Sequence, residues 1–409
     1  MYIHEFRVRN YMIHQDTEVL LQPLTVLVGP NGGGKSAFFD SILNFSMLSR
    51  GNIREAYGPY PFSFRATLYR GASLPRIGFK TILSKSQDDA DRIGYEIDYS
   101  QNEQGNGEPT FMISHEKLRR IPSNEVIFDR SDPDHYPITK LLRLENDRSL
   151  LSSIRLMRPA QKATLDPMLE YVTQQISRFN KFRLEPFSLA NPSRLPDVTA
   201  EPMPASMPRI GYHGEDLAST LYFLSQTNHP SLEKIRQKVR ELVPEFEDFE
   251  FSTVGTDRIA FAVKYSDQRG TVPSVRLSSG MLTYIGLIAL VSTPNRPSVL
   301  MIEEPENGLT PQAVKAFYDA VRQLAFSKDT TSQSQILISS HSPFVICEAW
   351  NGDDRNFIHQ VRVADGKAII RNFSAVIKKQ EVPLAKVDGK RGYLGLKTAE
   401  EVMSGRFSE

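Results

Sequence analysis

A glycine-rich loop close to the start of the chain constrains its fold more than any other feature. Residues 29–36 read Gly-Pro-Asn-Gly-Gly-Gly-Lys-Ser and match G-x-x-x-x-G-K-[ST] at every fixed position. The apolar stretch 24–28 predicts a strand before the loop, and the residues from Ser36 to Leu48 predict a helix after it. Such a loop turns backbone N–H groups around phosphate oxygens, and the positive end of the helix points at them. The chain is therefore predicted to bind a nucleoside triphosphate.

The chemistry of this loop assigns roles to individual side chains. Lys35 is expected to reach the β- and γ-phosphates, and the hydroxyl of Ser36 is expected to ligate Mg²⁺. The residues of the loop that are predicted to bind the nucleotide are Gly29, Asn31, Gly32, Gly33, Gly34, Lys35, Ser36 and Ala37. A Gly-rich turn with a chance Lys-Ser is the alternative, and the flanking strand and helix disfavour it.

Composition limits the classes of partner and the compartment. The 409 residues include 49 Lys and Arg against 48 Asp and Glu, so the net charge gives no reason to expect nucleic acid or an anionic membrane. The single cysteine, Cys347, cannot form an internal disulfide, which favours a reducing compartment. No run of 18 apolar residues exists, and residues 1–5 are not typical of a signal peptide. We therefore expect a cytoplasmic protein without a membrane segment.

Hydrophobic periodicity predicts an α/β head with an insertion. Strands are expected at 3–8, 18–21, 64–69, 77–83 and 95–99, the last three as an antiparallel layer over the nucleotide site. Residues 137–183 have helical spacing, and the five prolines from Pro192 to Pro208 predict a linker. The predicted division is a head formed by residues 1–136 and 211–409 and a helical insertion with a Pro-rich linker over residues 137–210.

The second part of the chain alternates helices with buried strands. Helices are expected at 217–224, 232–243 and 311–326, and strands at 259–265, 298–302 and 335–339. This alternation implies a parallel sheet that is completed from two distant parts of the chain.

Two carboxylates and a histidine follow the last two of these strands. Ligands bind at the carboxyl ends of strands in α/β sheets, which is where Glu303 and Glu304 fall. We expect Glu303 to hold the metal and Glu304 to polarise the attacking water, because phosphoryl transfer needs both tasks. His341 could sense or stabilise a γ-phosphate. A solvated strand end and a structural histidine are the alternatives.

The segment Leu277-Ser-Ser-Gly280 is typical of a helix entry. Ser278 or Ser279 would cap a helix over residues 281–291. A serine-capped helix N-terminus beside Gly280 is also a second phosphate-binding device. A chain with two such devices can bind one nucleotide between two copies of itself.

In this order, the motifs resemble the ABC-type ATPase heads of the SMC, RecF and OLD proteins. They are a Walker A loop (29–36), a signature (277–281), a Walker B strand with Glu304, a D-loop (305–309) and a switch (Ser340-His341-Ser342). More narrowly, the chain is similar to bacterial predicted AAA ATPases related to RecF, many of which serve in anti-phage defence beside a nuclease or toxin subunit. The resemblance implies an ABC-ATPase head of the α/β class, with a mixed sheet around a P-loop core, an antiparallel β layer and a helical insertion.

The resemblance also implies how such a site works. ATP and Mg²⁺ are the implied cofactors, and the chain is implied to hydrolyse ATP to ADP and phosphate. One subunit contributes Lys35, Ser36, Glu303, Glu304 and His341. Ser278, Ser279 and Gly280 act in trans on the γ-phosphate that the partner subunit holds, so ATP clamps a head-to-tail homodimer.

The chain departs from the family pattern at three places. Glu303 stands where ABC heads usually have Asp, which lengthens the reach to Mg²⁺ by one methylene. Thr310 ends the D-loop where relatives often have His or Asp. The glutamine of the Q-loop is not placed, and Gln161 is a weak candidate for it.

Spacing and local charge bear on the partners. The separation of Lys35 from Leu277 is too long for a transporter domain and too short for the arms of SMC proteins. The tail after His341 is too short for the nuclease domain of OLD proteins, so an effector is expected in trans. Basic residues gather over 360–397 and over 155–183, the latter group being Arg155, Arg158, Lys162, Arg178, Lys181 and Arg183. They suit a phosphate backbone, an acidic partner or plain solvation.

Three functions remain open on the sequence. The first is an ATP-dependent switch that dimerises on ATP and regulates an effector nuclease or toxin, in anti-phage defence. The second is a RecF-like clamp that grips DNA in repair or recombination, against which the near-neutral net charge argues. The third is a slow or inactive ATPase that serves as an assembly scaffold.

Overall fold

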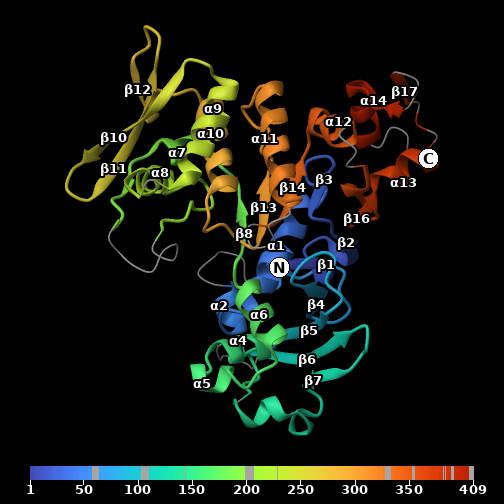
Figure 1. Cartoon of the computed structure of the whole chain (residues 1–409). Coiled ribbons are helices and arrows are strands. Elements are labelled where there is room, and N and C mark those ends of the chain that lie inside the picture. Colours follow the sequence, from blue (N-terminus) through green and yellow to red (C-terminus); the bar gives the residue numbers. More distant parts are fainter. Residues whose placement is uncertain are drawn as a thin grey trace. The chain divides into compact units, whose positions relative to one another are not determined.

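A computed structural model provides the fold (Figure 1). It describes residues 1–57, 64–102, 110–142, 144–198, 207–227, 229–327, 333–351, 355–380, 382, 384–387 and 391–404. The chain divides into two compact units: unit 1 is Met1–Phe179, Asp354–Pro383 and Glu401–Glu409, and unit 2 is Asn180–Asp353 and Leu384–Glu400. Residues 199–206 of the predicted linker lie outside the described residues.

Unit 1 contains a six-stranded antiparallel sheet. Its strands, in spatial order, are β2 (His14–Leu20), β1 (Tyr2–Tyr11), β4 (Arg76–Ser84), β5 (Arg92–Asn102), β6 (Thr110–Ile121) and β7 (Val126–Asp129). The strands predicted at 3–8, 77–83 and 95–99 are confirmed within β1, β4 and β5. An antiparallel β layer is thus part of the fold.

The strand predicted at 64–69 is wrong, because helix α3 (Phe64–Thr67) occupies this place after helix α2 (Ile53–Tyr57). Phe64 and Thr67, three positions apart, are both buried, which is the spacing of a helical turn. The Thr67 hydroxyl donates to the carbonyl of Phe64. The short apolar run fits the period of a strand as well as that of a helix, and burial in the folded chain decides for the helix.

The core of unit 1 lies between this sheet and helix α1 (Lys35–Leu48), whose predicted range is confirmed. The ring of Phe6 on β1 lies 5.8 Å from the rings of both Phe38 and Phe45 on α1, and 5.9 Å from Phe79 on β4. All four side chains are fully buried. This aromatic contact fixes the helix that begins at the phosphate loop.

A second set of strands in unit 1 carries the loop itself. Strand β3 (Leu24–Val28) pairs in parallel with β15 (Ile358–Ala364), which pairs antiparallel with β16 (Lys367–Asn372) before helix α13 (Phe373–Lys379). All five residues of β3 are buried. The expected parallel pairing of distant parts of the chain is confirmed by β3 and β15.

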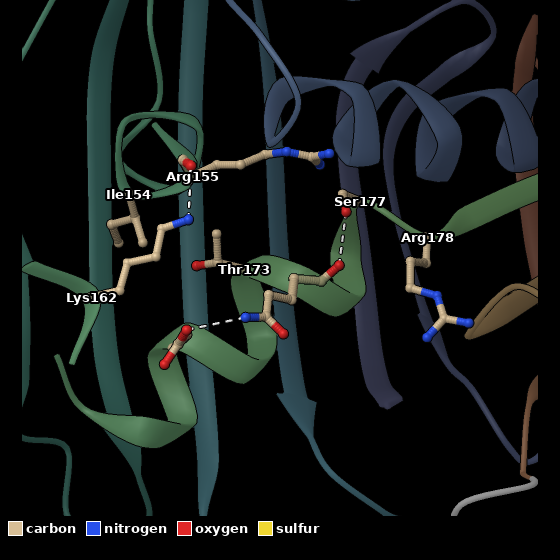
Figure 2. Close-up of a pocket in the computed structure, with 8 residues that line it drawn as sticks. Ile154, Arg155, Lys162, Thr173, Ser177 and Arg178 are labelled. Carbon is tan, nitrogen blue, oxygen red and sulfur yellow. Dashed lines mark hydrogen bonds between the residues drawn. The ribbon is translucent and has the colours of Figure 1, made fainter. Parts of the chain in front are cut away.

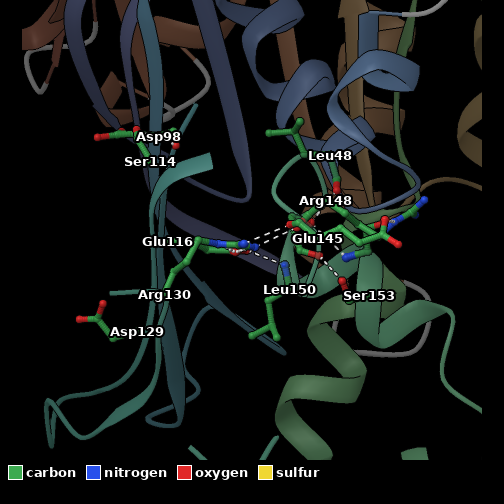
Figure 3. A network of polar contacts seen from close by, with 12 residues as sticks. Leu48, Asp98, Ser114, Glu116, Asp129, Arg130, Glu145, Arg148, Leu150 and Ser153 are labelled. Atoms are coloured by element: carbon green, nitrogen blue, oxygen red, sulfur yellow. Dashed lines mark hydrogen bonds and ion pairs between the residues drawn. The ribbon is translucent and has the colours of Figure 1, made fainter. Parts of the chain in front are cut away.

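A buried polar network joins the antiparallel sheet to the start of helix α4 (Leu150–Arg155) in the predicted insertion (Figure 3). Helices α5 (Pro159–Lys162) and α6 (Pro167–Ile176) follow α4 in the chain. Glu116 on β6 is fully buried and accepts hydrogen bonds from the Tyr95 hydroxyl at 2.6 Å and from the backbone N–H of Leu150 at 2.7 Å. Arg130 donates to the same carboxylate at 2.6 Å and to the carbonyl of Arg148 at 2.8 Å.

Unit 2 is built around a parallel pair of buried strands. Strands β13 (Val299–Glu303) and β14 (Gln335–Ser340) are parallel, helix α11 (Pro311–Ala325) lies between them in sequence, and β8 (Phe179–Phe182) follows β13 in the strand order. Helix α10 (Ser279–Ser292) is buried at every residue from Met281 to Val291. The predicted ranges of these two strands and two helices are confirmed.

Further elements lie wholly or mostly in unit 2 and are labelled where there is room in Figure 1. They are α7 (Pro186–Ala190), β9 (Ser193–Arg194), α8 (Leu217–Gln226), α9 (Pro230–Leu242), β10 (Phe246–Val254), β11 (Arg258–Tyr265), β12 (Thr271–Pro273), α12 (Pro343–Asn351), β17 (Ala385–Val387), β18 (Arg391–Tyr393) and α14 (Leu396–Met403). Strands β10, β11 and β12 form an antiparallel sheet. Among the described residues, no helix is both long enough and apolar enough to cross a membrane.

Candidate nucleotide-binding and hydrolysis residues

The backbone of the phosphate loop in unit 1 has the shape that its glycines permit. Gly32 and Gly34 have φ angles of 76° and 104°, in the left-handed region. A Cβ on Gly29 would lie 2.0 Å from the carbonyl oxygen of Val361, whereas a Cβ on Gly32 would meet nothing within 4 Å. The loop therefore packs tightly at its start and leaves open space at its exposed tip, residues 30–32.

The side chain of Lys35 folds back onto the phosphate loop. Its Nζ donates to the carbonyl of Gly29 at 2.8 Å and to that of Pro30 at 3.0 Å, and the residue is buried. Ser36 beside it is exposed and Ala37 is half-buried. The predicted ligands from Gly29 to Ala37 thus lie together, with an ammonium group and a hydroxyl at the start of α1.

A buried histidine that the sequence analysis did not identify supports this loop. His14 on β2 contacts the carbonyl of Gly34 with Nε2 and the hydroxyl of Thr17 with Nδ1, both at 3.0 Å. Burial lowers the pKa of His14 to about 4. The imidazole is therefore neutral near pH 7, and Nε2–H donates because a carbonyl can only accept. No local sequence signal links His14 to the loop.

Glu303 and Glu304 at the end of β13 have different surroundings. Glu303 is buried, whereas Glu304 is half-buried and has a left-handed φ of 47°. Such a backbone angle is uncommon outside glycine and concentrates at functional sites. The Glu304 N–H donates to the carbonyl of Ser339 at 2.8 Å, and its Oε2 accepts from Asn307 at 3.1 Å.

The structure places two cations of β8 and the loop after it against these carboxylates. Lys181 Nζ lies 3.5 Å from Glu303 Oε2, and Arg183 lies 3.4 Å from Glu304 Oε2. The Tyr212 hydroxyl donates to Glu303 Oε2 at 3.2 Å. Lys181 and Arg183, grouped by sequence with a basic cluster of the insertion, thus pair with acids in unit 2. No sequence signal predicts these pairs, because they join residues that are distant in sequence.

The side chain of His341 lies close to the carboxylate of Glu304. Its Nδ1 lies 3.3 Å from Glu304 Oε1 and 3.5 Å from Glu306 Oε1. Glu306 in turn accepts from the Ser340 hydroxyl at 2.7 Å and from the His341 N–H at 3.1 Å. The D-loop glutamate therefore positions the backbone that carries the histidine.

The signature segment begins helix α10 as predicted. Ser278 is the N-cap, and its Oγ accepts from the N–H of Met281 at 3.2 Å. Ser278 and Ser279 are exposed. A Cβ on Gly280 would lie 2.5 Å from the carbonyl oxygen of Gly308, so the D-loop and the signature touch through their backbones.

Gln161, the candidate for the Q-loop glutamine, forms hydrogen bonds within unit 1. Its Oε1 accepts from the N–H of Arg158 at 3.0 Å, and its Nε2 donates to the carbonyl of Leu141 at 3.0 Å. The first contact belongs to a capping box of helix α5. Both ends of its amide therefore serve the local fold of unit 1.

Three residues of the basic cluster line a hollow beside α4, α5 and α6 (Figure 2). These are Arg155, Lys162 and Arg178, with Glu170 as the acidic lining residue. Lys162 Nζ donates to the carbonyl of Arg155 at 2.9 Å, and the Glu170 carboxylate accepts from Gln174 at 3.1 Å. Three of the six residues of the predicted cluster thus line this hollow, and Lys181 and Arg183 contact the carboxylates of unit 2. Arg158 belongs to neither set.

Each unit carries groups of the kind that bind a Mg²⁺-nucleotide. In unit 1, the ammonium group of Lys35 lies at the phosphate loop where α1 begins. In unit 2, Glu303 Oε1 is buried and makes no hydrogen bond with the described residues. The described residues contain no group of three His, Cys, Asp or Glu that could hold a metal ion. Mg²⁺ does not need one, because it keeps several waters and binds through one or two carboxylates plus phosphate oxygens.

Comparisons with known proteins give one relative in sequence and several solved structures of low overall similarity. An "OLD nuclease" from Thermus scotoductus (strain ATCC 700910 / SA-01) is 22% identical over 90% of this chain and 66% of its own length, so the chain spans slightly less than two thirds of that relative. The SMC head domain from Thermotoga maritima has a TM-score of 0.43 at 11% identity and covers 91% of this chain and 99% of its own. An Smc head bound to the C-terminal domain of ScpA, from Pyrococcus furiosus, has a TM-score of 0.47 at 11% identity, with coverage of 93% and 98%.

A family model matches most of the chain. It is described as "AAA domain, putative AbiEii toxin, Type IV TA system", and it matches residues 24–347, from the strand before the phosphate loop to the helix after His341. The predicted resemblance to ATPase heads of the OLD type is confirmed by this match and by the OLD relative. The chain belongs to this family of AAA-domain ATPases.

Proposed function

We propose that the chain is an ATPase that binds and hydrolyses ATP with Mg²⁺, dimerises on ATP, and regulates an effector nuclease or toxin in bacterial anti-phage defence. The family match supports the ATPase part, and the family description includes a toxin system. The defence role rests on the sequence resemblance. The single cysteine, Cys347, supports a cytoplasmic location.

The observation that carries the hydrolytic assignment is the surroundings of Glu304. Its carboxylate stands at the end of a buried strand on a left-handed backbone, with His341 at one oxygen and Asn307 at the other. A carboxylate restrained in this way can orient a water and accept its proton as the water attacks the γ-phosphorus. His341 can donate to the developing negative charge on the phosphoryl oxygens.

Residues of the phosphate loop would bind the phosphates of ATP and neutralise part of their negative charge. Lys35 would exchange its carbonyl partners for phosphate oxygens, which neutralises charge as the bond to the leaving ADP breaks. Ser36 and Glu303 are the proposed metal ligands, and bound Mg²⁺ would polarise the phosphoryl oxygens. Main-chain N–H groups of residues 31–34 would orient the phosphates.

Dimerisation is proposed from the exposed signature at the N-terminus of α10. Ser278, Ser279 and Gly280 would contact the γ-phosphate of ATP on the partner subunit. Static light scattering with a slowly hydrolysed ATP analogue tests this: the wild type and Ser279→Ala should double in mass, and Ser279→Arg should stay monomeric. ATP-driven dimers of Ser279→Arg, or a wild type that stays monomeric, would refute the shared site.

DNA binding is the second candidate function, and the basic excess over residues 360–397 favours it. If the chain grips DNA, binding should weaken steeply with salt and disappear in the Lys378→Glu/Lys379→Glu variant. If it is a protein-directed switch, the wild type should show no such affinity in fluorescence anisotropy with duplex DNA. An assembly scaffold would instead show ATP binding with negligible turnover.

A further inference from the structure

The two oxygens of the Glu303 carboxylate have different environments. Oε2 is held twice, by Lys181 Nζ at 3.5 Å and by the Tyr212 hydroxyl at 3.2 Å. Lys181 Nζ also lies 5.3 Å from the centre of the Tyr212 ring, in a cation–π contact. The Glu303 and Lys181 side chains are only 3% and 9% exposed, so this is a buried ion pair.

Oε1 of the same carboxylate is buried and makes no hydrogen bond with the described residues. An unsatisfied carboxylate oxygen in a buried position is costly, which indicates a missing ligand. The metal predicted at Glu303 would satisfy it. The carboxylate is thus fixed at Oε2 by the chain's own residues and open at Oε1.

We propose that Lys181 is the built-in counter-ion of Glu303, and that it sets how tightly this carboxylate binds Mg²⁺. Without metal, the ammonium neutralises a carboxylate that is otherwise buried with an uncompensated charge. With metal, the same ammonium repels the arriving divalent cation. Lys181 acts through Glu303 and is therefore a positioning residue rather than a catalytic one. The metal part of this inference rests on the proposed function.

A substitution of Lys181 could act on Glu303 by changing its charge environment or by changing its orientation, and Tyr212 allows the two effects to be distinguished. Its hydroxyl keeps Glu303 Oε2 in place when the ammonium is removed. Charge rather than orientation then decides the result. Lys181→Met should bind Mg²⁺ more tightly than the wild type although it is less stable without metal, a combination that a purely structural role does not produce.

The test uses the full chain and thermal melting. In EDTA, Lys181→Met should melt below the wild type, and Lys181→Met/Glu303→Gln should regain most of the loss, because the buried charge is gone. With saturating ADP, the Mg²⁺ concentration that gives half of the melting shift should fall by at least about tenfold in Lys181→Met, the size that one unit charge about 6 Å from a divalent cation produces even at the dielectric constant of water, about 80. Lys181→Arg should restore the wild-type value.

Arg183→Met is the matched control. Arg183 follows the same strand but pairs with Glu304, and its side chain is 52% exposed. It should change neither the melting point in EDTA nor the Mg²⁺ midpoint. A Lys181→Met variant with wild-type melting in EDTA, or with an unchanged or raised Mg²⁺ midpoint, overturns the counter-ion role. A wild type that Mg²⁺ and ADP do not stabilise overturns the proposed function and the metal part, while the EDTA comparison still decides the pairing.

Discussion

The phosphate loop of unit 1 and the acidic strand end of unit 2 are built in opposite ways. Backbone makes the loop: its carbonyls hold Lys35, its glycines adopt left-handed angles, and its residues are contiguous. Side chains make the strand end: the Glu303 carboxylate is held by Lys181 and Tyr212, which lie about a hundred positions away in the chain. The structure of the phosphate loop thus depends on close backbone packing, and that of the acidic strand end depends on the pairing of charges.

The two regions therefore tolerate different substitutions. The phosphate loop should be destabilised by an added side-chain atom that overlaps a backbone neighbour, because the backbone cannot move away as a flexible side chain can. A charge-balanced strand end fails when one partner is removed, because a buried carboxylate is left unpaired. Substitutions that separate these two modes of failure test the comparison.

The largest effect is expected at the start of the loop. Gly29→Ala places a Cβ 2.0 Å from the backbone oxygen of Val361, which should cost about 4 kcal/mol of unfolding free energy. Gly32→Ala is the control in the same loop: it meets no atom but has a φ of 76°, so it should cost about 1 kcal/mol. Denaturant unfolding measures both. Equal costs would show that space does not limit the loop.

The acidic strand end should show a middle-sized effect without any change in space. Tyr212→Phe removes the hydroxyl that donates to Glu303, and losing a hydrogen bond to a buried charge should cost about 2 kcal/mol. Tyr222→Phe serves as a control on a tyrosine away from these carboxylates. Urea unfolding of both variants gives the difference, and a neutral Tyr212→Phe would mean that Lys181 alone balances Glu303.

The smallest expected effect is a dependence of the unfolding free energy on pH, which arises from His14 beside the phosphate loop. Burial lowers the pKa of His14 to about 4 from its ordinary 6.5, so the unfolded chain takes up this proton first as the pH falls. The stability present at pH 7 is therefore lost progressively as the pH drops from 6.5 toward 4. Between pH 7 and 5.5 the wild type should lose about 1 kcal/mol more than His14→Gln, which keeps a donor for Gly34 but does not titrate. Equal losses in urea unfolding at the two pH values would contradict the buried neutral imidazole.

The same contrast explains what could be predicted from sequence. The loop and helix α1 follow from adjacent residues, and the buried strands β13 and β14 follow from their apolar runs. The pairing of Lys181 with Glu303 could not be predicted, since it depends on β8 joining a strand about 120 residues later. The strand predicted at 64–69 is wrong because a short apolar run fits both the strand and the helix period, and only the burial of Phe64 and Thr67 decides for the helix.

In the proposed function, the phosphate loop of unit 1 binds ATP and the acidic strand end of unit 2 hydrolyses it. The most direct test measures ATP affinity and single-turnover hydrolysis in Lys35→Ala and Glu304→Gln. Lys35→Ala should lose both, whereas Glu304→Gln should keep wild-type affinity while hydrolysis falls about 10²–10³-fold. Wild-type hydrolysis in Glu304→Gln, or unchanged ATP affinity in Lys35→Ala, would contradict the claim.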